Sequence, residues 1–519
     1  ALTANTTADA NTAVGFLSIG ANTTGTNNVA LGNTALRQNT TASENTAIGS
    51  VSMFSNTTGA SNTAVGYDSL STNTTASNNT AVGKAALKVN TTGTENVAMG
   101  VNALDANTTG GSNTAIGNGS LSANTTADHN TAVGRDVLVA NTTGASNTAM
   151  GSQALDANTT ASNNTAIGKS ALGANTTGTQ NVAVGALVLD AHTTGGENTA
   201  IGYGSLSAST TASNNVAVGS TALLTNTTGA SNVAVGRRAL FSNTTAANNT
   251  AIGNQALLSN TTGDKNVSVG ATSLDANTTG ASNTAIGFES LTANVAGSKS
   301  VGVGTGTLSD QNPSSASDMF NTAVGFNAAA SVTTGTSNTT VGGLSLDANT
   351  TGSSNTALGR SAMTANTTGG DNTSVGRGSM SSSTTGSNNA ALGFNALASN
   401  TTASNNTAVG SAALSANTTG ANNTSVGMQS MQDNTTGANN VAMGQAALAN
   451  NTTASSNVAL GYSALATCTT GGTNTAVGFQ AMVGLIGGGA NTAVGQQAGA
   501  SITSGDNNTC VGMVAGSSI

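Results

Sequence analysis

The sequence predicts an all-β fold, a parallel β-solenoid (β-roll) of about 30 coils with a 17-residue period. The string Asn-Thr-Ala-Val-Gly or a close variant recurs every 17 residues from Asn11 to Ser300, and again from Asn321 to Asn508, which makes 30 starts. The consensus is N-T-A-V-G-x-x-A-L-x-x-N-T-T-G-x-x, and its positions are called columns 1 to 17 below. Every coil has a glycine in column 5, and most carry N-T-T-G or N-T-T-A; glycine and threonine are poor helix formers, so a helical repeat is excluded.

Columns 1 to 4 are predicted to form a strand. Column 2 exchanges Thr for Val, two residues with the same β-branched shape, and column 4 is Val, Ile, Leu or Met in all 30 coils, as at Val14. Alternation along a strand puts columns 2 and 4 on one face and the Ala of column 3 on the other. We expect column 4 to share the core with column 9, as at Leu36, and column 3 to allow close approach of another chain.

The rest of each coil is predicted to turn the chain back. Column 5 is glycine in every coil, for example Gly15, Gly32 and Gly49, which indicates a positive φ or a backbone approach too close for a Cβ atom. A short second strand is expected over columns 7 to 10, followed by an N-T-T-G turn. Parallel strands about 4.8 Å apart would stack 30 such coils into a rod of about 140 Å.

Two asparagine columns have a structural interpretation. Column 1 is Asn in 29 coils, including Asn11, Asn28 and Asn45, and column 12 is Asn in 21, including Asn39. Stacked asparagines can pass amide hydrogen bonds from coil to coil, and an asparagine at a turn can adopt left-handed or Asx-turn geometry. The sequence leaves both roles open.

The pattern divides the chain into three segments. Residues 1–304 are regular repeats, residues 305–320 are an irregular turn insertion with the only proline, and residues 321–519 continue the repeats and degenerate from about residue 483. Asp310, Asn312 and Pro313 form a candidate contact bulge, with a tolerated loop insertion as the alternative. Because both ends fall inside a coil, we expect a segment of a longer fibre.

Composition and spacing offer little chemistry. The net charge is −8 with no basic patch, so nucleic acid is not an expected partner, and no apolar run is long enough for membrane insertion. His129 and His192 have no ligand-spaced partners, and Cys468 and Cys510 lie three coils apart, too far for a disulfide. We therefore expect no catalytic residues, no metal site and no cofactor, and hence no enzyme.

The N-T-T tripeptide leaves two surface functions open. It is a glycosylation acceptor sequence in most coils, for example at Asn22, although it also serves as plain turn chemistry. Its two threonine columns resemble ice-binding arrays, but adjacent threonines on a strand point to opposite sides. An ice-binding or glycosylated coat protein is thus a third interpretation.

The repeat resembles those of phage tail-fibre proteins, which often end in an endosialidase-type chaperone domain. Residues 474–482 (NTAVGFQAM) and 491–499 (NTAVGQQAG) carry this resemblance most closely. The strand motif is also similar to the S-V-A-I-G motif of trimeric autotransporter adhesin heads, whose repeat is shorter.

These resemblances imply a homotrimeric fibre located in a virion, or outside the cell or on its surface. The expected function is the shaft of a phage tail fibre, which positions a receptor-binding tip for host attachment. Variable columns 6, 7, 10, 16 and 17 could touch a host cell-surface glycan or protein. The alternative is a bacterial cell-surface adhesin or extracellular filament.

Overall fold

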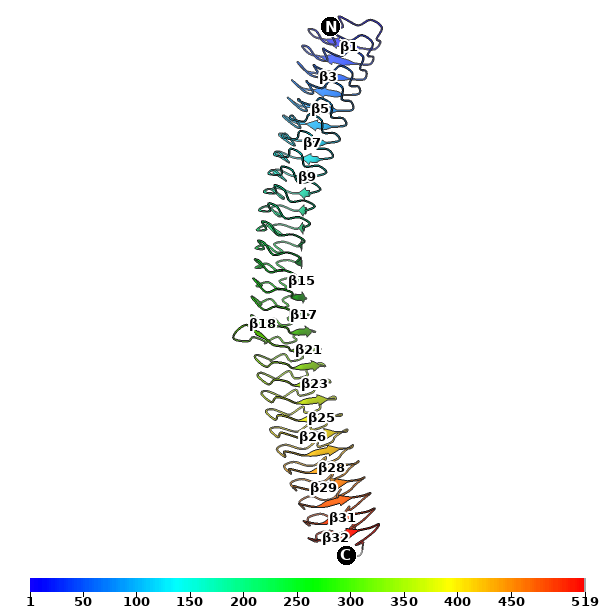
Figure 1. Ribbon diagram of the computed structural model, residues 1–519, viewed down its shortest axis with the longest axis vertical. Coiled ribbons are helices and arrows are strands. Elements are labelled where there is room, and N and C mark those ends of the chain that lie inside the picture. Colours follow the sequence, from blue (N-terminus) through cyan, green and yellow to red (C-terminus); the bar gives the residue numbers. More distant parts are fainter. Residues whose placement is uncertain (518–519) are drawn as a thin grey trace. The chain divides into compact units, whose positions relative to one another are not determined.

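The computed structural model describes residues 1–517, which form an all-β parallel solenoid with a period of about 17 residues and no helix among them (Figure 1). The chain divides into two compact units, Ala1–Gln255 (unit 1) and Ala256–Ile519 (unit 2). Each unit contains one parallel ladder of 15 three-residue strands, and the predicted fold class is confirmed.

The strands of unit 1 all occupy columns 2 to 4: β1 (Thr12–Val14), β2 (Val29–Leu31), β3 (Thr46–Ile48), β4 (Thr63–Val65), β5 (Thr80–Val82), β6 (Val97–Met99), β7 (Thr114–Ile116), β8 (Thr131–Val133), β9 (Thr148–Met150), β10 (Thr165–Ile167), β11 (Val182–Val184), β12 (Thr199–Ile201), β13 (Val216–Val218), β14 (Val233–Val235) and β15 (Thr250–Ile252).

Unit 2 repeats this arrangement and adds two short strands at the insertion, β18 and β20: β16 (Val267–Val269), β17 (Thr284–Ile286), β18 (Gly297–Ser298), β19 (Val301–Val303), β20 (Ser317–Asp318), β21 (Thr322–Val324), β22 (Thr339–Val341), β23 (Thr356–Leu358), β24 (Thr373–Val375), β25 (Ala390–Leu392), β26 (Thr407–Val409), β27 (Thr424–Val426), β28 (Val441–Met443), β29 (Val458–Leu460), β30 (Thr475–Val477), β31 (Thr492–Val494) and β32 (Thr509–Val511).

The register of the ladders follows the repeat. Each residue pairs with the residue one period later, as Thr12 with Val29 and Ala13 with Ala30. The strand is one residue shorter than expected, and the predicted second strand over columns 7 to 10 is wrong. Columns 7 and 9 instead turn the chain tightly in left-handed conformations, with φ of 50° at Leu17 and 46° at Ile19.

The core reverses the predicted faces of the strand. Column 3 points inward, where Ala30 is fully buried with Ala35 of column 8 and Leu36 of column 9. Column 4 points outward, and Val14 is 56% exposed. The coil is so narrow that the strand lies against the turn of columns 7 to 9, and an alanine is the side chain that fits there beside a leucine. Column 3 is therefore not a surface for another chain.

Wherever column 3 carries a hydroxyl group, column 8 of the same coil is a serine. Column 3 is a buried hydroxyl residue at Ser268, Thr340, Ser374 and Ser425, and column 8 is a serine in each of these coils. The Thr340 and Ser345 hydroxyls lie 2.6 Å apart, and Ser425 Oγ donates to the Ser430 carbonyl oxygen at 2.7 Å. A paired hydroxyl avoids the cost of a buried unsatisfied polar group, so the core tolerates these substitutions.

The glycine of column 5 combines a positive φ with a close approach of the next coil's backbone, the two properties that its invariance indicated. Gly32 has a φ of +143°, and a Cβ atom there would overlap the carbonyl group of Gly49 in the next coil. The next coil therefore approaches so closely that no larger residue fits at this corner. Gly15 and Gly49, both with a φ of +131°, have the same environment.

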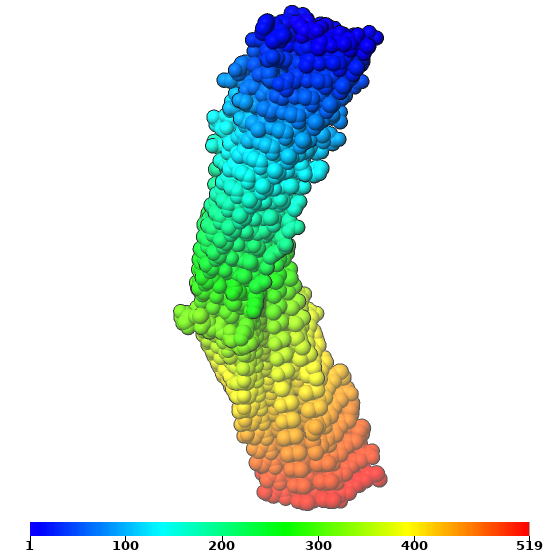
Figure 2. Space-filling view, turned by 45° about the horizontal axis from the view of Figure 1, so that its top comes forward, coloured from blue at the N-terminus to red at the C-terminus, as the bar shows by residue number. Residues whose placement is uncertain are grey.

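The insertion forms a small knob on the surface of unit 2 (Figure 2). Its strands β18 and β20 pair in parallel, with Gly297 opposite Ser317. Pro313 and Met319 are buried, whereas residues 314–316 are exposed. The extra residues are thus accommodated outside the coil while two apolar side chains cover its interior.

Candidate functional site: ladders and outer surfaces

The column 1 asparagines connect each coil to the next through the backbone. Asn11 Oδ1 accepts a hydrogen bond from the Asn28 backbone N–H at 2.9 Å, and Asn28 Oδ1 accepts one from the Asn45 N–H at 3.0 Å. Asn28 Nδ2 donates to the carbonyl oxygen of Ala42, in column 15, at 2.9 Å. A column 1 side chain therefore satisfies one backbone donor and one backbone acceptor.

The column 12 asparagines form a second ladder, between side chains. Asn39 Nδ2 donates to Asn22 Oδ1 at 2.9 Å and to the column 15 carbonyl oxygen of Ala42 at 2.9 Å. That carbonyl oxygen is the one that also accepts from Asn28 of column 1. The two asparagine columns thus converge on a shared backbone acceptor.

These contacts show which of the two roles that the sequence left open applies to each asparagine column. Asn28 and Asn39 are fully buried, and neither has a positive φ. The left-handed residues lie in columns 7, 9 and 17, as at Leu17, Ile19 and Asn27. The asparagines of column 1 are therefore ladder residues, whereas those of column 12 are ladder residues that also hydrogen-bond within their own turn, as Asn39 does to Ala42.

The candidate contact bulge is only partly on the surface. Asp310 and Asn312 are exposed, whereas Pro313 is buried against the preceding coil. The surface of the knob carries an ion pair between Lys299 Nζ and Asp318 Oδ2 at 2.6 Å. The structure thus brings two of the three predicted residues to a surface where a partner could reach them.

The two histidines and the two cysteines do not form a reactive cluster. His192 takes an asparagine position in column 12, with Nε2 2.7 Å from the Gly195 carbonyl oxygen and Nδ1 3.2 Å from Ser209 Oγ. Burial lowers the pKa of His192. Cys468 and Cys510 are buried free thiols, and burial raises the pKa of Cys468. Residues 1–517 contain no group of three or more metal-ligating side chains placed to hold an ion.

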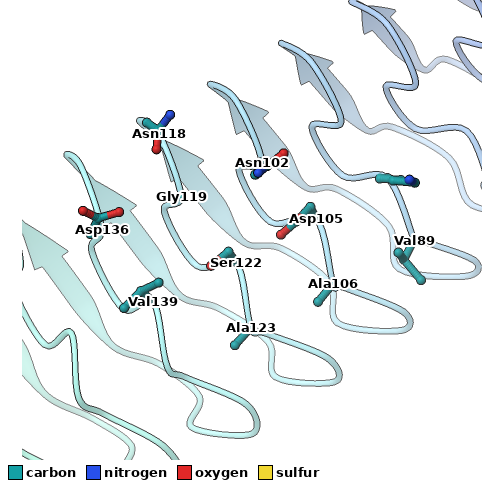
Figure 3. A pocket seen from close by; sticks show the side chains of 11 residues that line it. Val89, Asn102, Asp105, Ala106, Asn118, Gly119, Ser122, Ala123, Asp136 and Val139 are labelled. Carbon is teal, nitrogen blue, oxygen red and sulfur yellow. The ribbon is translucent and has the colours of Figure 1, made fainter.

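A shallow groove of about 660 Å³ crosses four consecutive coils of unit 1 (Figure 3). Its polar lining includes Lys88, Asn102, Asp105 and Asp136. Burial raises the pKa of Asp105, and a hydrogen bond from Lys88 to Asp68 raises the pKa of Lys88. An open groove with separated polar groups can hydrogen-bond to a polar ligand such as a glycan, but it places no base beside a nucleophile.

The outward face of each ladder is uncharged and presents an aliphatic column, column 4, to solvent, which sequence reasoning missed. Column 2 is Thr, Val or Ala and column 4 is Val, Ile, Leu or Met in every coil, so the face carries no charge. Met99, Met150 and Ile201, all in column 4, are 42%, 42% and 39% exposed. Most of the exposed large hydrophobic side chains of the described residues lie in columns 4 and 6.

Column 6 adds an aromatic edge to this face. Eight of the 11 aromatic residues lie in column 6, and each of the eight is at least 45% exposed: Phe16, Tyr67, Tyr203, Phe288, Phe326, Phe394, Tyr462 and Phe479. This clustering was a signal available in the sequence, because a random distribution would scatter the aromatics over all columns.

Comparison with known proteins does not assign the chain to a family. No family model matches the chain, and no curated protein matches it in sequence. Within residues 1–517, no helix has the length and hydropathy of a membrane span.

Proposed function

We propose that the chain is a structural fibre protein, the shaft of a phage tail fibre that positions a receptor-binding tip for host attachment. The observation that carries the proposal is the pair of asparagine ladders, whose contacts repeat from coil to coil within each unit. A threonine ladder supports them, since Thr23 Oγ1 donates to the Thr40 carbonyl oxygen at 3.1 Å. A stack tied by backbone and side-chain hydrogen bonds resists bending and stretching, as a spacer must.

The resemblance of the repeat to phage tail-fibre repeats supplies the biological setting. It implies a location in the virion, a homotrimeric assembly, and a host glycan or protein as the final partner of the tip. The exposed Asp310 and Asn312, and the groove beside Asp105, are places where the shaft itself could touch the host.

Immunogold labelling tests the setting. Antibodies against the purified chain are applied to phage particles and to the cells that encode it. Labelling along thin appendages of the particles is expected. Labelling of the cell envelope in the absence of phage particles would overturn the tail-fibre proposal in favour of a bacterial cell-surface adhesin or extracellular filament. The similarity of the strand motif to autotransporter adhesin heads is the observation behind that alternative.

The ladders argue against the third interpretation. The N-T-T asparagine is buried in the folded coil, and Asn39 Nδ2 already donates two hydrogen bonds, so a glycan cannot be attached there without unfolding the coil. The column 13 hydroxyls donate to the next coil, so of the two threonine columns only the exposed column 14 faces solvent, and one column is not an ice-binding array. Mass spectrometry of the native protein is expected to show no glycan on the N-T-T asparagines, and a thermal hysteresis measurement is expected to show no ice binding.

A further inference from the structure

The outward face of unit 1 is an uncharged strip with oppositely charged edges, in which the aliphatic column 4 lies beside a column 2 of Thr and Val. The strip consists of columns 2 and 4 of strands β1 to β15, and its side chains are uncharged. Column 6 borders one edge and carries four exposed cations, Lys84, Arg135, Lys169 and Arg237, with no acid. Columns 16 and 17 border the other edge and carry five exposed acids with no Lys or Arg: Asp9, Glu44, Glu95, Asp128 and Glu197.

We propose that this strip is the surface through which copies of the chain associate, side by side, parallel and in register. The proposal rests on the fibre function proposed above and names the face that such an assembly would use. The expected partner is a second copy of this chain, with the cationic edge of one copy against the acidic edge of the other.

The periodicity of the strip favours a partner with the same period. Column 4 stays aliphatic in all coils although it is exposed or half-buried and never buried, whereas its neighbour in column 6 varies from Phe16 to Lys84 to Arg135. A compact globular partner or a short glycan would contact only a few coils and would leave the others free to vary. A second solenoid repeats at the same spacing of about 4.8 Å and contacts every coil.

The size of the strip is close to that of one side of a specific protein interface. Fifteen strands at about 4.8 Å and a width of about three residues give an area on the order of 700 Å² in unit 1. Specific protein interfaces bury about 800 Å² per partner. The column 6 aromatics Phe16, Tyr67 and Tyr203, which are 72%, 57% and 58% exposed, add residues of the type enriched in interfaces.

The charged edges determine the relative direction of the copies. When two copies face each other around an axis parallel to the stack, column 6 of one lies opposite columns 16 and 17 of the other. An antiparallel arrangement puts like charges together, which is repulsive. In the parallel register, Arg135 and Asp128 both flank β8, and Lys84 after β5 is about one coil from Glu95 before β6. In a parallel ring of three copies, the cationic edge of each copy would likewise lie beside the acidic edge of the next.

Most cations of the column 6 edge form no ion pair within the described part of their own chain. In the part of the chain that the structure describes, Arg135 is the only one of the four cations with an ion pair, to the adjacent Asp136 at 3.7 Å. The acids Glu95 and Asp128 accept hydrogen bonds from Ser112 Oγ and the Gly111 backbone N–H, which leaves further lone pairs on each carboxylate.

A charge-swap experiment on the full chain tests the proposal. One variant combines Arg135→Glu, Lys169→Glu and Arg237→Glu, and the other combines Glu95→Lys, Asp128→Lys and Glu197→Lys. Native mass is measured by light scattering at low salt, with circular dichroism to confirm folding. Each variant alone is expected to weaken association at least tenfold, and an equal mixture is expected to form mixed oligomers. A control adds the same negative charge away from the strip and should associate like the wild type. It replaces six exposed column 14 threonines with glutamate: Thr75, Thr92, Thr109, Thr126, Thr143 and Thr160.

Column 4 of the strip is tested separately by Ile116→Lys, Ile167→Lys and Ile201→Lys in one chain, which is expected to be monomeric. If the wild type associates and both the charge-swap and the strip variants still do, the proposed face is wrong while the fibre assembly stands. If the wild type is monomeric, the association itself is overturned, and the shaft function is then decided by the immunogold labelling. A monomer with thermal hysteresis would assign the strip to ice instead.

Discussion

Column 12 is filled differently in the middle of unit 1 and in the last coils of unit 2. Between Asn107 and Asn175 it is an unbroken amide ladder, whereas the last coils carry Cys468, Leu485 and Ile502. All of these residues are buried, with at most 3% of their surface exposed. The same position thus accepts either a polar ladder or an apolar column.

Column 1 does not vary in this way, because its hydrogen bonds differ. Asn474 Oδ1 accepts from the Asn491 backbone N–H, and its Nδ2 donates to the Gly488 carbonyl oxygen at 2.9 Å. The column 15 carbonyl oxygens therefore keep one donor when column 12 becomes apolar. A side-chain ladder can be replaced as a block because donors and acceptors disappear together, whereas the loss of a column 1 asparagine leaves backbone groups unpaired.

The largest effect is expected in column 1. Asn147→Ala removes the acceptor for the Asn164 N–H, but the Ala161 carbonyl oxygen keeps Asn158 as its donor. The cost is expected to be about 2 kcal/mol of local opening free energy. Asn474→Ala also leaves the Gly488 carbonyl oxygen without a side-chain donor, because column 12 is Leu485 there. Its cost should be about 1–3 kcal/mol larger.

Hydrogen exchange of the full chain measures these local free energies, which a single melting temperature would average over many coils. Equal losses of protection around Asn147 and Asn474 would show that the column 12 donor does not compensate for the loss of the column 1 donor to the column 15 carbonyl oxygen.

Two reciprocal substitutions in column 12, one from polar to apolar and one from apolar to polar, are expected to have smaller effects. Asn141→Leu interrupts the ladder, since Asn141 donates to Asn124 Oδ1 and accepts from Asn158 Nδ2. Leu485→Asn places an amide between Cys468 and Ile502, which offer no equivalent ladder. Each should cost about 1–3 kcal/mol of local opening free energy by hydrogen exchange. If either substitution is neutral, the two fillings are interchangeable one residue at a time and the block argument fails.

The coil of His192 should lose stability at low pH. Burial holds the folded-state pKa of His192 below the ordinary value of 6.5, so as pH falls below that value the unfolded chain binds a proton that the folded coil resists. Protection of the neighbouring amides should therefore be complete above pH 7 and decline towards pH 5. His192→Asn restores the residue found in the regular ladder and should remove this pH dependence. A decline that persists in the variant would assign the effect to other groups.

The smallest effect is expected in column 7, which is alike in both regions. Ser170 has a φ of 54° and Ser463 a φ of 51°, and glycine already occupies this column at Gly204, with a φ of 60°. Ser170→Gly and Ser463→Gly should each stabilise their coil by less than about 1 kcal/mol, because glycine adopts this conformation without strain. Calorimetric unfolding and hydrogen exchange should show similar gains, and a loss in both would contradict the expected relief of strain.

Much of the fold follows directly from the repeat. The spacing of 17 predicts parallel coils in register, and the pairing of Thr12 with Val29 confirms it. The invariant glycine predicts a close approach, which the Gly32–Gly49 contact confirms. These inferences succeed because a repeated local pattern must be satisfied by the same neighbours in every coil.

The orientation of the strand was decided only in three dimensions. The alternation of columns 2, 3 and 4 separates two faces but does not say which one is inside, and the larger residues of column 4 suggested the wrong answer. The left-handed turn at columns 7 and 9 places Leu36 close behind the strand, and this leaves room for Ala30 but not for Leu31. Residue type by itself thus determined the stack and its ladders, whereas the narrow cross-section determined that the aliphatic column lies outside, where a second copy can reach it.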